Sequence, residues 1–224
     1  MKLTIFYLMI IFSWLASTPS FAQVPPDANE IEQYKGLHAA AFRNDIAAIK
    51  KIAITTTDMN PRDNAQRTPA HVAAYASAYD ALKALVAAGA DINAMDRDQY
   101  DVITISAVKN DVRMVSLAIS LGGNPKLVTS PYLGTALIAA AHLGHVEVVK
   151  TLIAAGAPLD HVNNLSWTAL IEAVILGNGG PKHIATVRAL IEGGADKSIA
   201  DDDGTTPLQH AKIRKFNQII KLLE

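Results

Sequence analysis

Apolar residues recur in short helical stripes along most of the chain. Pairs one turn apart occur at Ala81/Leu82 with Leu85/Val86, at Met114/Val115 with Ala118/Ile119, and at Val148/Val149 with Leu152/Ile153. This i, i+1, i+4, i+5 spacing is typical of a helix that is buried along one face. A glycine and a polar loop such as "GADINAMDRDQ" follow each stripe. The pattern predicts units made of a turn, a short helix, a longer helix and an extended loop.

The units repeat with a nearly fixed period. The column that holds threonine in most copies marks the register, and the marks are Lys35, Thr68, Asp101, Thr135, Thr168 and Thr206. Successive marks lie 33, 33, 34, 33 and 38 residues apart. One unit cannot cover its own apolar faces, whereas stacked neighbours can, so the period predicts an all-α repeat solenoid.

The fifth unit is longer than the others because it contains five additional residues. Its cap glycine, Gly194, comes five residues later than the period requires. The additional segment lies around Asn178 to Lys182, within "LGNGGPKH". This stretch lacks the G-x-x-x-x-G-K-[ST] spacing of a phosphate-binding loop. We therefore interpret it as a widened turn that shapes this end of the solenoid.

Two copies of a short motif carry a family resemblance: "TPAHVA" from Thr68 and "TPLQHA" from Thr206. With the 33-residue period, they resemble the TPLHxA signature of the ankyrin repeat family. The resemblance implies paired antiparallel helices with β-hairpin or finger loops, in about five full repeats plus a C-terminal cap. The predicted domain is residues 34–224, after a polar leader at 23–33. The repeats are expected at 35–67, 68–100, 101–134, 135–167 and 168–205, with the cap at 206–224.

The chain departs from the family pattern in several places. The third copy has Asp101 in place of threonine, and the first has Thr56 in place of its cap glycine. The glycine of the finger is replaced by Gln66, Gln99, Leu133 and Ser166. These changes are expected to weaken local turn geometry without breaking the register.

The first 22 residues have the order of a secretory signal peptide. Lys2 precedes an apolar run to about Ala16, and Pro19 and small residues lead to Ala22. The run is shorter than the ~20 residues of a membrane span. We expect cleavage after Ala22 and a periplasmic or secreted protein without a membrane anchor, similar to small exported bacterial ankyrin repeat proteins.

Composition narrows the function classes. The 224 residues include 20 Lys plus Arg against 21 Asp plus Glu, and no cysteine. A near-neutral chain without a basic block disfavours a nucleic-acid partner. The missing cysteine excludes disulfides and thiol chemistry. No clustered acid–base set is evident, so we expect a protein that is not an enzyme, binds no cofactor or metal, and is monomeric.

The histidines and one glutamate invite structural roles. His38 and His71 occupy the histidine position of the family motif, where the imidazole ties the turn to the backbone. His142 and His145 are spaced as two metal ligands could be, but no third ligand is evident. Glu172 stands among apolar residues of its column and needs a partner if it is buried. We expect it to act as a structural pin, paired with His210 or with backbone N–H groups of the insertion.

The family resemblance places partner contacts on the finger tips and the inner helices. Aromatic residues among these positions are candidate anchors. The candidate partner-binding residues are Phe42, Arg43, Arg67, Tyr75, Tyr100, Lys109, Tyr132, His142, Leu143, Leu165 and Trp167. The expected function is non-enzymatic binding of another protein through this concave surface, in support of an exported enzyme such as catalase. The alternative is an inhibitor or immunity protein for a toxic effector.

Overall fold

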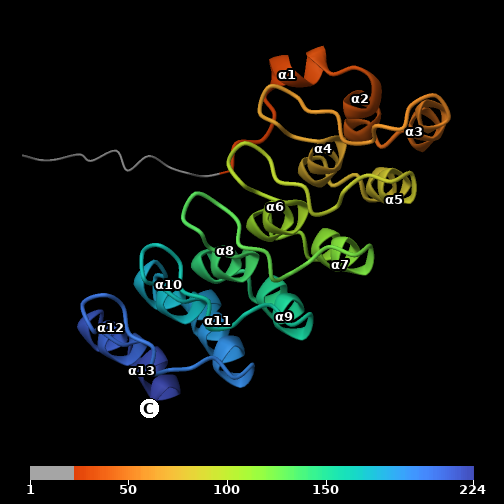
Figure 1. The fold of residues 1–224 in the computed structure, drawn as a ribbon. Helices are drawn as coiled ribbons and strands as arrows, with labels where there is room; N and C mark the ends of the chain where they lie inside the picture. The colour runs from red at the N-terminus through yellow and green to blue at the C-terminus, as the bar shows by residue number, and fades with distance from the viewer. Residues whose placement is uncertain (1–22) are drawn as a thin grey trace, which may run out of the picture.

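The computed structural model describes residues 23–224 and consists of stacked helix pairs (Figure 1). A short helix, α1 (Ala28–Gln33), precedes the pairs. The inner helices are α2 (Gly36–Phe42), α4 (Pro69–Tyr75), α6 (Val102–Val108), α8 (Ala136–Leu143), α10 (Ala169–Ile175) and α12 (Pro207–Ile213). The outer helices are α3 (Ile46–Ala53), α5 (Tyr79–Ala87), α7 (Val112–Ser120), α9 (Val146–Ala154), α11 (Pro181–Glu192) and α13 (Asn217–Leu223). This arrangement confirms the predicted all-α solenoid. The predicted signal peptide lies outside the described residues.

Every residue predicted to mark the register is the N-cap of an inner helix. Thr68 caps α4 in a capping box, and Thr206 caps α12 in the same way. Asp101 replaces threonine and still caps α6, because its carboxylate accepts a hydrogen bond from the Thr104 N–H at 2.8 Å. In all of these helices except α2, whose N-cap Lys35 makes no capping bond, the side chain of the N-cap accepts from an N–H group that has no partner within the helix, which explains why Thr or Asp recurs at this position.

The core is one continuous apolar layer between inner and outer helices. Ala73, Ala107 and Ala141 are fully buried on successive inner helices. Their small side chains let the helices of neighbouring repeats approach closely, while Leu82 on α5 and Leu152 on α9 are fully buried side chains of the outer helices in the same layer. Each repeat therefore buries its apolar faces against its neighbours, as stacking requires.

The finger loops are tight turns, all on the same side of the stack (Figure 1). Each finger is numbered with the helix pair that follows it, so the second to sixth fingers are residues 63–67, 96–100, 129–134, 163–167 and 201–205, and α12 with α13 completes the sixth repeat. In the described residues the predicted β-hairpin is reduced to one isolated antiparallel bridge, between Thr129 and Gly134. An Asp or Asn side chain shapes most of the turns: Asp96, for example, accepts from the N–H groups of Asp98 and Tyr100, both at 2.9 Å. The residues that replace the finger glycine take left-handed backbone, with φ of 59° at Gln66, 62° at Gln99, 53° at Leu133 and 61° at Ser166.

The polar leader is part of the fold. Asp27 and Glu30 form a capping box that starts α1. The Glu30 carboxylate reaches the guanidinium of Arg67 at 2.5 Å, and the Val24 carbonyl accepts from the same guanidinium at 3.3 Å. Residues 23–33 thus lie against the second finger, which their polar composition alone did not indicate.

A basic side chain ties most inner helices to the following repeat. These side chains donate hydrogen bonds to carbonyls at or just beyond the C-terminus of the preceding inner helix, where carbonyls lack partners within the helix. The bonds run from Lys109 to Ala74 and Tyr75, from His145 to Ala107, from His183 to His142, and from Arg214 to Ile175 and Gly177.

The glycine-rich insertion packs against the final repeat. The carbonyl of Gly177 accepts from Arg214, and Asn178 accepts from the N–H of Gly180. At Gly179, with φ of 68°, an added Cβ would come within 2.4 Å of the Phe216 ring. The insertion therefore needs glycine both for its backbone and for this close approach.

Candidate protein-binding surface

The structure removes Arg67 from the predicted contact surface. Its side chain is fully buried, and it pairs with Glu30 at 2.5 Å and with Asp63 at 2.7 Å. Burial raises the pKa of Asp63, but the bonds from Arg67 and from the Tyr34 hydroxyl outweigh it and hold this pKa below its usual value. The position before the register mark faces the leader here, so Arg67 is a structural residue that anchors residues 23–33.

Two further N-terminal candidates are also engaged within the chain. Tyr100 is only 6% exposed, so it belongs to the core rather than to a free finger tip. Lys109 is on the surface, but its ammonium group donates to the carbonyls of Ala74 and Tyr75 and to Ser77. Phe42 and Tyr75 are half-buried against the core.

The remaining candidates differ in exposure. Tyr132 and Trp167 are half-buried, and the other four are exposed: Arg43, His142, Leu143 and Leu165. Most of the accessible candidates therefore come from the fourth and fifth repeats. The surface offered by the first three repeats is largely occupied by contacts within the chain.

Glu172 is buried and has partners within the chain, but the prediction that these are His210 or backbone amides of the insertion is wrong. Its carboxylate is buried, accepts from the Asn163 amide at 2.8 Å and lies 3.4 Å from the His142 ring. His210 instead pairs with Asp201 at 2.7 Å. The two polar side chains of this column, Glu172 and His210, thus each bond to the finger of their own repeat. The contacts are equivalent in position, but Glu172 accepts from its finger and His210 donates to its finger.

The predicted ties from histidine to backbone are confirmed. The Nε2 of His38 bonds the Arg67 carbonyl at 2.9 Å, and the Nε2 of His71 bonds the Tyr100 carbonyl at 3.0 Å. His145, the second histidine of the spaced pair, bonds the Ala107 carbonyl instead of facing His142. Among residues 23–224, no three His, Asp or Glu side chains cluster closely enough to hold a metal ion.

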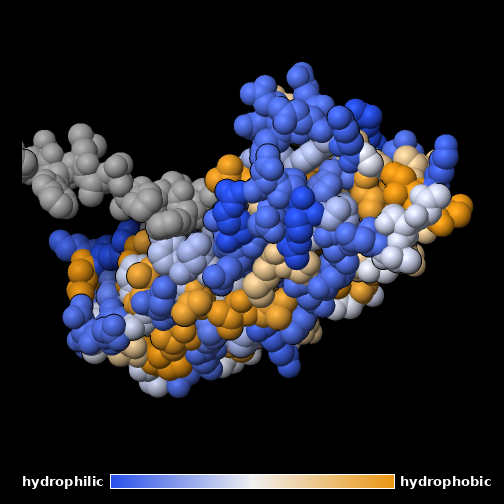
Figure 2. Space-filling model, turned by 45° about the horizontal axis from the view of Figure 1, so that its top comes forward, coloured by the Kyte–Doolittle hydropathy of each residue, from blue (hydrophilic) through white to orange (hydrophobic). Residues whose placement is uncertain are grey.

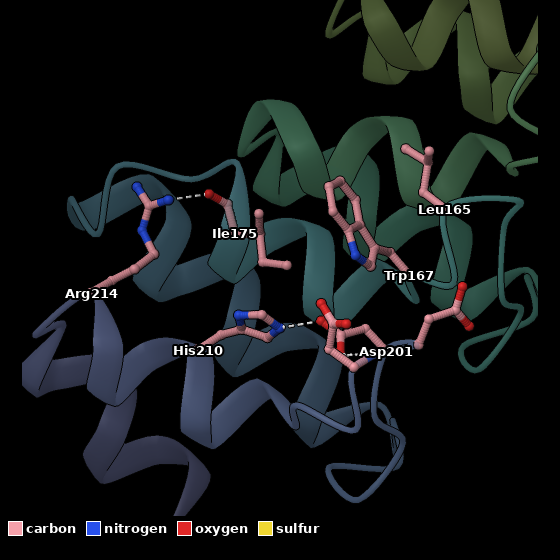
Figure 3. Close-up of a pocket in the computed structure, with 8 residues that line it drawn as sticks. Leu165, Trp167, Ile175, Asp201, His210 and Arg214 are labelled. Atoms are coloured by element: carbon pink, nitrogen blue, oxygen red, sulfur yellow. Dashed lines mark hydrogen bonds and ion pairs between the residues drawn. The ribbon is translucent and has the colours of Figure 1, made fainter.

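A groove of about 450 Å³ lies between the last two repeats (Figure 3). Its size is within the range of roughly 300–1,000 Å³ that is usual for ligand-binding clefts. The residues that line it are Leu165, Trp167, Ile175, Asp201, Asp202, Asp203, His210 and Arg214.

The two sides of the groove differ in character. Trp167 and Leu165 extend from the fifth finger, and Ile175, at the end of α10, lies between Trp167 and Arg214 (Figure 3). Across from the indole, Asp201 and His210 form their ion pair. The Thr205 amide, and after it the His210 ring, hold the pKa of Asp201 below its usual value. The sequence identified Leu165 and Trp167, but not the acidic finger that faces them.

Exposed apolar side chains also occur beside the groove. Leu176 is 42% exposed, Leu143 39% and Ile213 72%, and all three lie at or just after the ends of inner helices. On the face visible in Figure 2, apolar side chains form separate patches between larger hydrophilic areas. No helix among the described residues is both long and apolar enough to traverse a bilayer.

Comparison with known proteins agrees with this architecture. A family model described as ankyrin repeats in three copies matches residues 11–96 and 103–201. The chain belongs to the ankyrin repeat family. Ankyrin repeats mediate binding of protein partners, and the family members similar to this chain are generally interaction modules without enzymatic activity.

Individual relatives of this ankyrin repeat protein cover most of its length. It is 33% identical to the ankyrin repeat protein YahD of Escherichia coli (strain K12), over 82% of this chain and 92% of that protein. The crystal structure of an ankyrin repeat domain from Acinetobacter baumannii AYE is 44% identical, with a TM-score of 0.79 over 84% of this chain and 95% of that one.

A more distant structure shares only the fold. It contains a predatory endopeptidase from Bdellovibrio bacteriovorus in complex with an immunity protein. The matched chain is 23% identical to this one, with a TM-score of 0.70 over 85% of this chain and 97% of the other.

Proposed function

We propose that this ankyrin repeat protein binds another protein through the finger and inner-helix surface of its fourth to sixth repeats. The observation that supports this is the groove lined by Trp167 and Leu165, beside the exposed side chains of Leu143 and Leu176. A half-buried indole next to exposed aliphatic groups is the composition of a protein-binding hot spot. The N-terminal half is less suited to binding a partner, because its candidates Arg67 and Lys109 already bond within the chain, Arg67 to the leader and Lys109 to main-chain carbonyls.

We further propose that the protein acts without catalysis, as a monomer exported by the signal at residues 1–22. The polar contacts of the groove support a non-enzymatic role. Asp201 and His210 pair with each other, and Arg214 donates to main-chain carbonyls, so these groups are committed to holding the fold. Neither a nucleophile with an adjacent base nor an oxyanion-binding pair is formed by the groove residues.

Two classes of partner fit an exported binding protein. The first is an exported enzyme that the protein supports, such as a catalase, as the resemblance to exported bacterial ankyrin proteins implies. The second is a toxic enzyme that the protein inhibits, and the similar fold found in the complex of an endopeptidase with an immunity protein favours this second class. Both classes use the same surface.

Affinity capture from a cell-envelope extract of the native host tests the proposal. The wild-type chain is compared with Trp167→Ala and with Arg43→Ala, an exposed candidate residue just after α2 that lies outside the proposed surface. Truncating a true anchor costs about 2 kcal/mol, or about thirtyfold in affinity. We expect Trp167→Ala to lose its partner and Arg43→Ala to keep it, with unchanged circular dichroism in both. Equal recovery by all three proteins would refute the proposed surface.

Incubating the purified chain with the captured protein separates the two partner classes. A partner enzyme that loses activity on binding identifies an inhibitor, and one that keeps or gains activity identifies a supporting protein. Trp167→Ala provides the control, because it should remove either effect.

A further inference from the structure

We infer that the groove between the fifth and sixth fingers binds an extended partner segment in which a Lys or Arg stands next to a large apolar side chain. This inference rests on the proposed function and names the chemistry of its partner. It combines three features of the groove: an interruption of the backbone bonds between fingers, an apolar wall, and two carboxylates without ion pairs.

Backbone hydrogen bonds join consecutive fingers until the groove is reached. The N–H of Arg97 donates to Ala65 at 3.0 Å, that of Ser130 to Gln99 at 2.9 Å, and that of Asn164 to Tyr132 at 2.9 Å. Within residues 23–224, no such bond joins the fifth finger to the sixth. By the repeat register, the donor of the next bond would be the Asp202 N–H, and its acceptor would be the Leu165 carbonyl, which corresponds to those of Ala65 and Tyr132 in the earlier fingers.

Leu165 and Asp202 both line the groove, and these two main-chain groups have no backbone partner among the described residues. An extended segment offers alternating donors and acceptors along its main chain and binds such open groups as an added strand does. The main-chain groups therefore favour an extended segment over a helix, whose backbone groups are already paired.

The apolar wall accepts one large side chain. Trp167 is half-buried, Leu165 is 42% exposed, and Ile175 closes the wall between Trp167 and Arg214 (Figure 3). Aromatic and aliphatic anchors that fill such a slot contribute most of the energy of an interface.

The charges at the groove select a basic neighbour for this anchor. Asp201 is paired with His210, and Arg214 lies over the Phe216 ring while it donates to carbonyls. Asp202 and Asp203, in contrast, are exposed, and neither forms an ion pair with another residue in the part of the chain that the structure describes. A cationic side chain beside them is attracted, and an acidic one is repelled.

Selection from a phage-displayed random 12-residue peptide library on the full-length chain tests this inference. We expect enriched peptides to carry Lys or Arg next to an aromatic or aliphatic residue. Synthetic versions are then titrated in a Trp14→Phe background, where Trp167 is the single tryptophan and its fluorescence reports on the groove.

Two charge variants are compared in this assay. Asp202→Asn with Asp203→Asn removes both free carboxylates and should weaken peptide binding about tenfold, and added salt should weaken the wild type in the same direction. Asp98→Asn is the matched control, because Asp98 holds in the third finger the position that Asp203 holds in the sixth. It should leave affinity unchanged.

The outcomes separate this inference from the proposed function. Selected peptides that change Trp167 fluorescence but show no basic enrichment, or that bind the double Asn variant equally well, would overturn the inferred chemistry. Peptides that bind without any fluorescence change would overturn the groove as their site. Independent of both, partner capture that is sensitive to Trp167→Ala would keep the proposed function.

Discussion

His71 is held in its neutral form by its surroundings, and replacing it should change how stability depends on pH. The Thr68 N–H donates to Nδ1 at 3.0 Å, so that nitrogen carries no proton, and Nε2–H donates to the Tyr100 carbonyl at 3.0 Å. Protonation of Nδ1 would break the first bond and bury a charge. Burial is the main cause that lowers the pKa of His71 to about 4, from a usual value of about 6.5.

The sign of the effect follows from which state binds the proton first. Between pH 6.5 and pH 4 the unfolded chain protonates this histidine and the folded chain does not. The contribution to stability is therefore complete above pH 6.5 and is lost as the pH falls towards 4. A pKa difference of about 2.5 corresponds to about 3 kcal/mol.

His71→Gln is the variant that isolates this contribution. Gln209 occupies the same position in α12, where its side chain accepts from the Thr206 N–H at 2.7 Å, so glutamine forms the capping box without titrating. At pH 7 the variant should be less stable than wild type by about 1 kcal/mol, because the bond to the Tyr100 carbonyl is lost. At pH 4 it should be more stable by about 2 kcal/mol.

Urea unfolding of both proteins from pH 7 to pH 4 measures the difference. The two stability curves should cross between about pH 5 and pH 6, and comparing the proteins at each pH cancels the titration of all other groups. A difference that stays constant over this range would refute the reasoning, since it would mean that His71 titrates alike in both states.

Three further predictions concern the turns and the leader. Leu133→Gly relieves left-handed backbone at φ 53° and should raise the free energy of unfolding by about 1 kcal/mol. Leu165→Gly is the control, because Leu165 has no positive φ to relieve, and it should lower the free energy of unfolding. Urea unfolding of the two variants and the wild type measures both changes. In Gly179→Ala the new Cβ would clash with the Phe216 ring, so the free energy of unfolding should fall by more than about 2 kcal/mol. Gly204→Ala, at a similar φ with open space around it, should lose about 1 kcal/mol. Equal losses in the two variants would contradict the close contact between Gly179 and Phe216. The stability lost in Asp63→Asn should be greatest at neutral pH. It should shrink as the pH falls below the usual pKa of an aspartate, about 3.9, because the unfolded wild type then binds a proton that the folded wild type, with its lowered pKa, does not; thermal unfolding across pH measures this.

The periodic features of the fold could be predicted from the sequence, whereas contacts outside the period could not. The register marks Thr68 and Asp101 recur with the period because each is the N-cap of its helix, and N-capping depends only on residues three positions apart. The pairing of Arg67 with Glu30 joins residues 37 apart across the leader, which belongs to no repeat, so nothing in the register indicates it.

Because contacts outside the period cannot be predicted from the repeat register, the sequence predicted only some of the residues of the candidate protein-binding surface. Trp167 and Tyr100 hold equivalent positions before their register marks, so the sequence treats them alike. Tyr100 is buried and Trp167 is half-exposed, because finger contacts continue beyond the third finger and are interrupted after the fifth. Exposure at this position depends on the neighbouring finger and not on the residue itself.

Because no backbone hydrogen bond joins the fifth finger to the sixth among the described residues, the stack is expected to unfold first from its C-terminal end. At the N-terminal end, the buried Arg67 pairs with Glu30 of the leader and Asp63 of the second finger. The sixth repeat, in contrast, has no backbone hydrogen bond from its finger to the fifth. In a stack whose stability is a sum of neighbouring contacts, the weakest junction opens first under proteolysis or mechanical load. A segment seated in the groove spans this junction, so occupancy by a partner lengthens the lifetime of the protein itself.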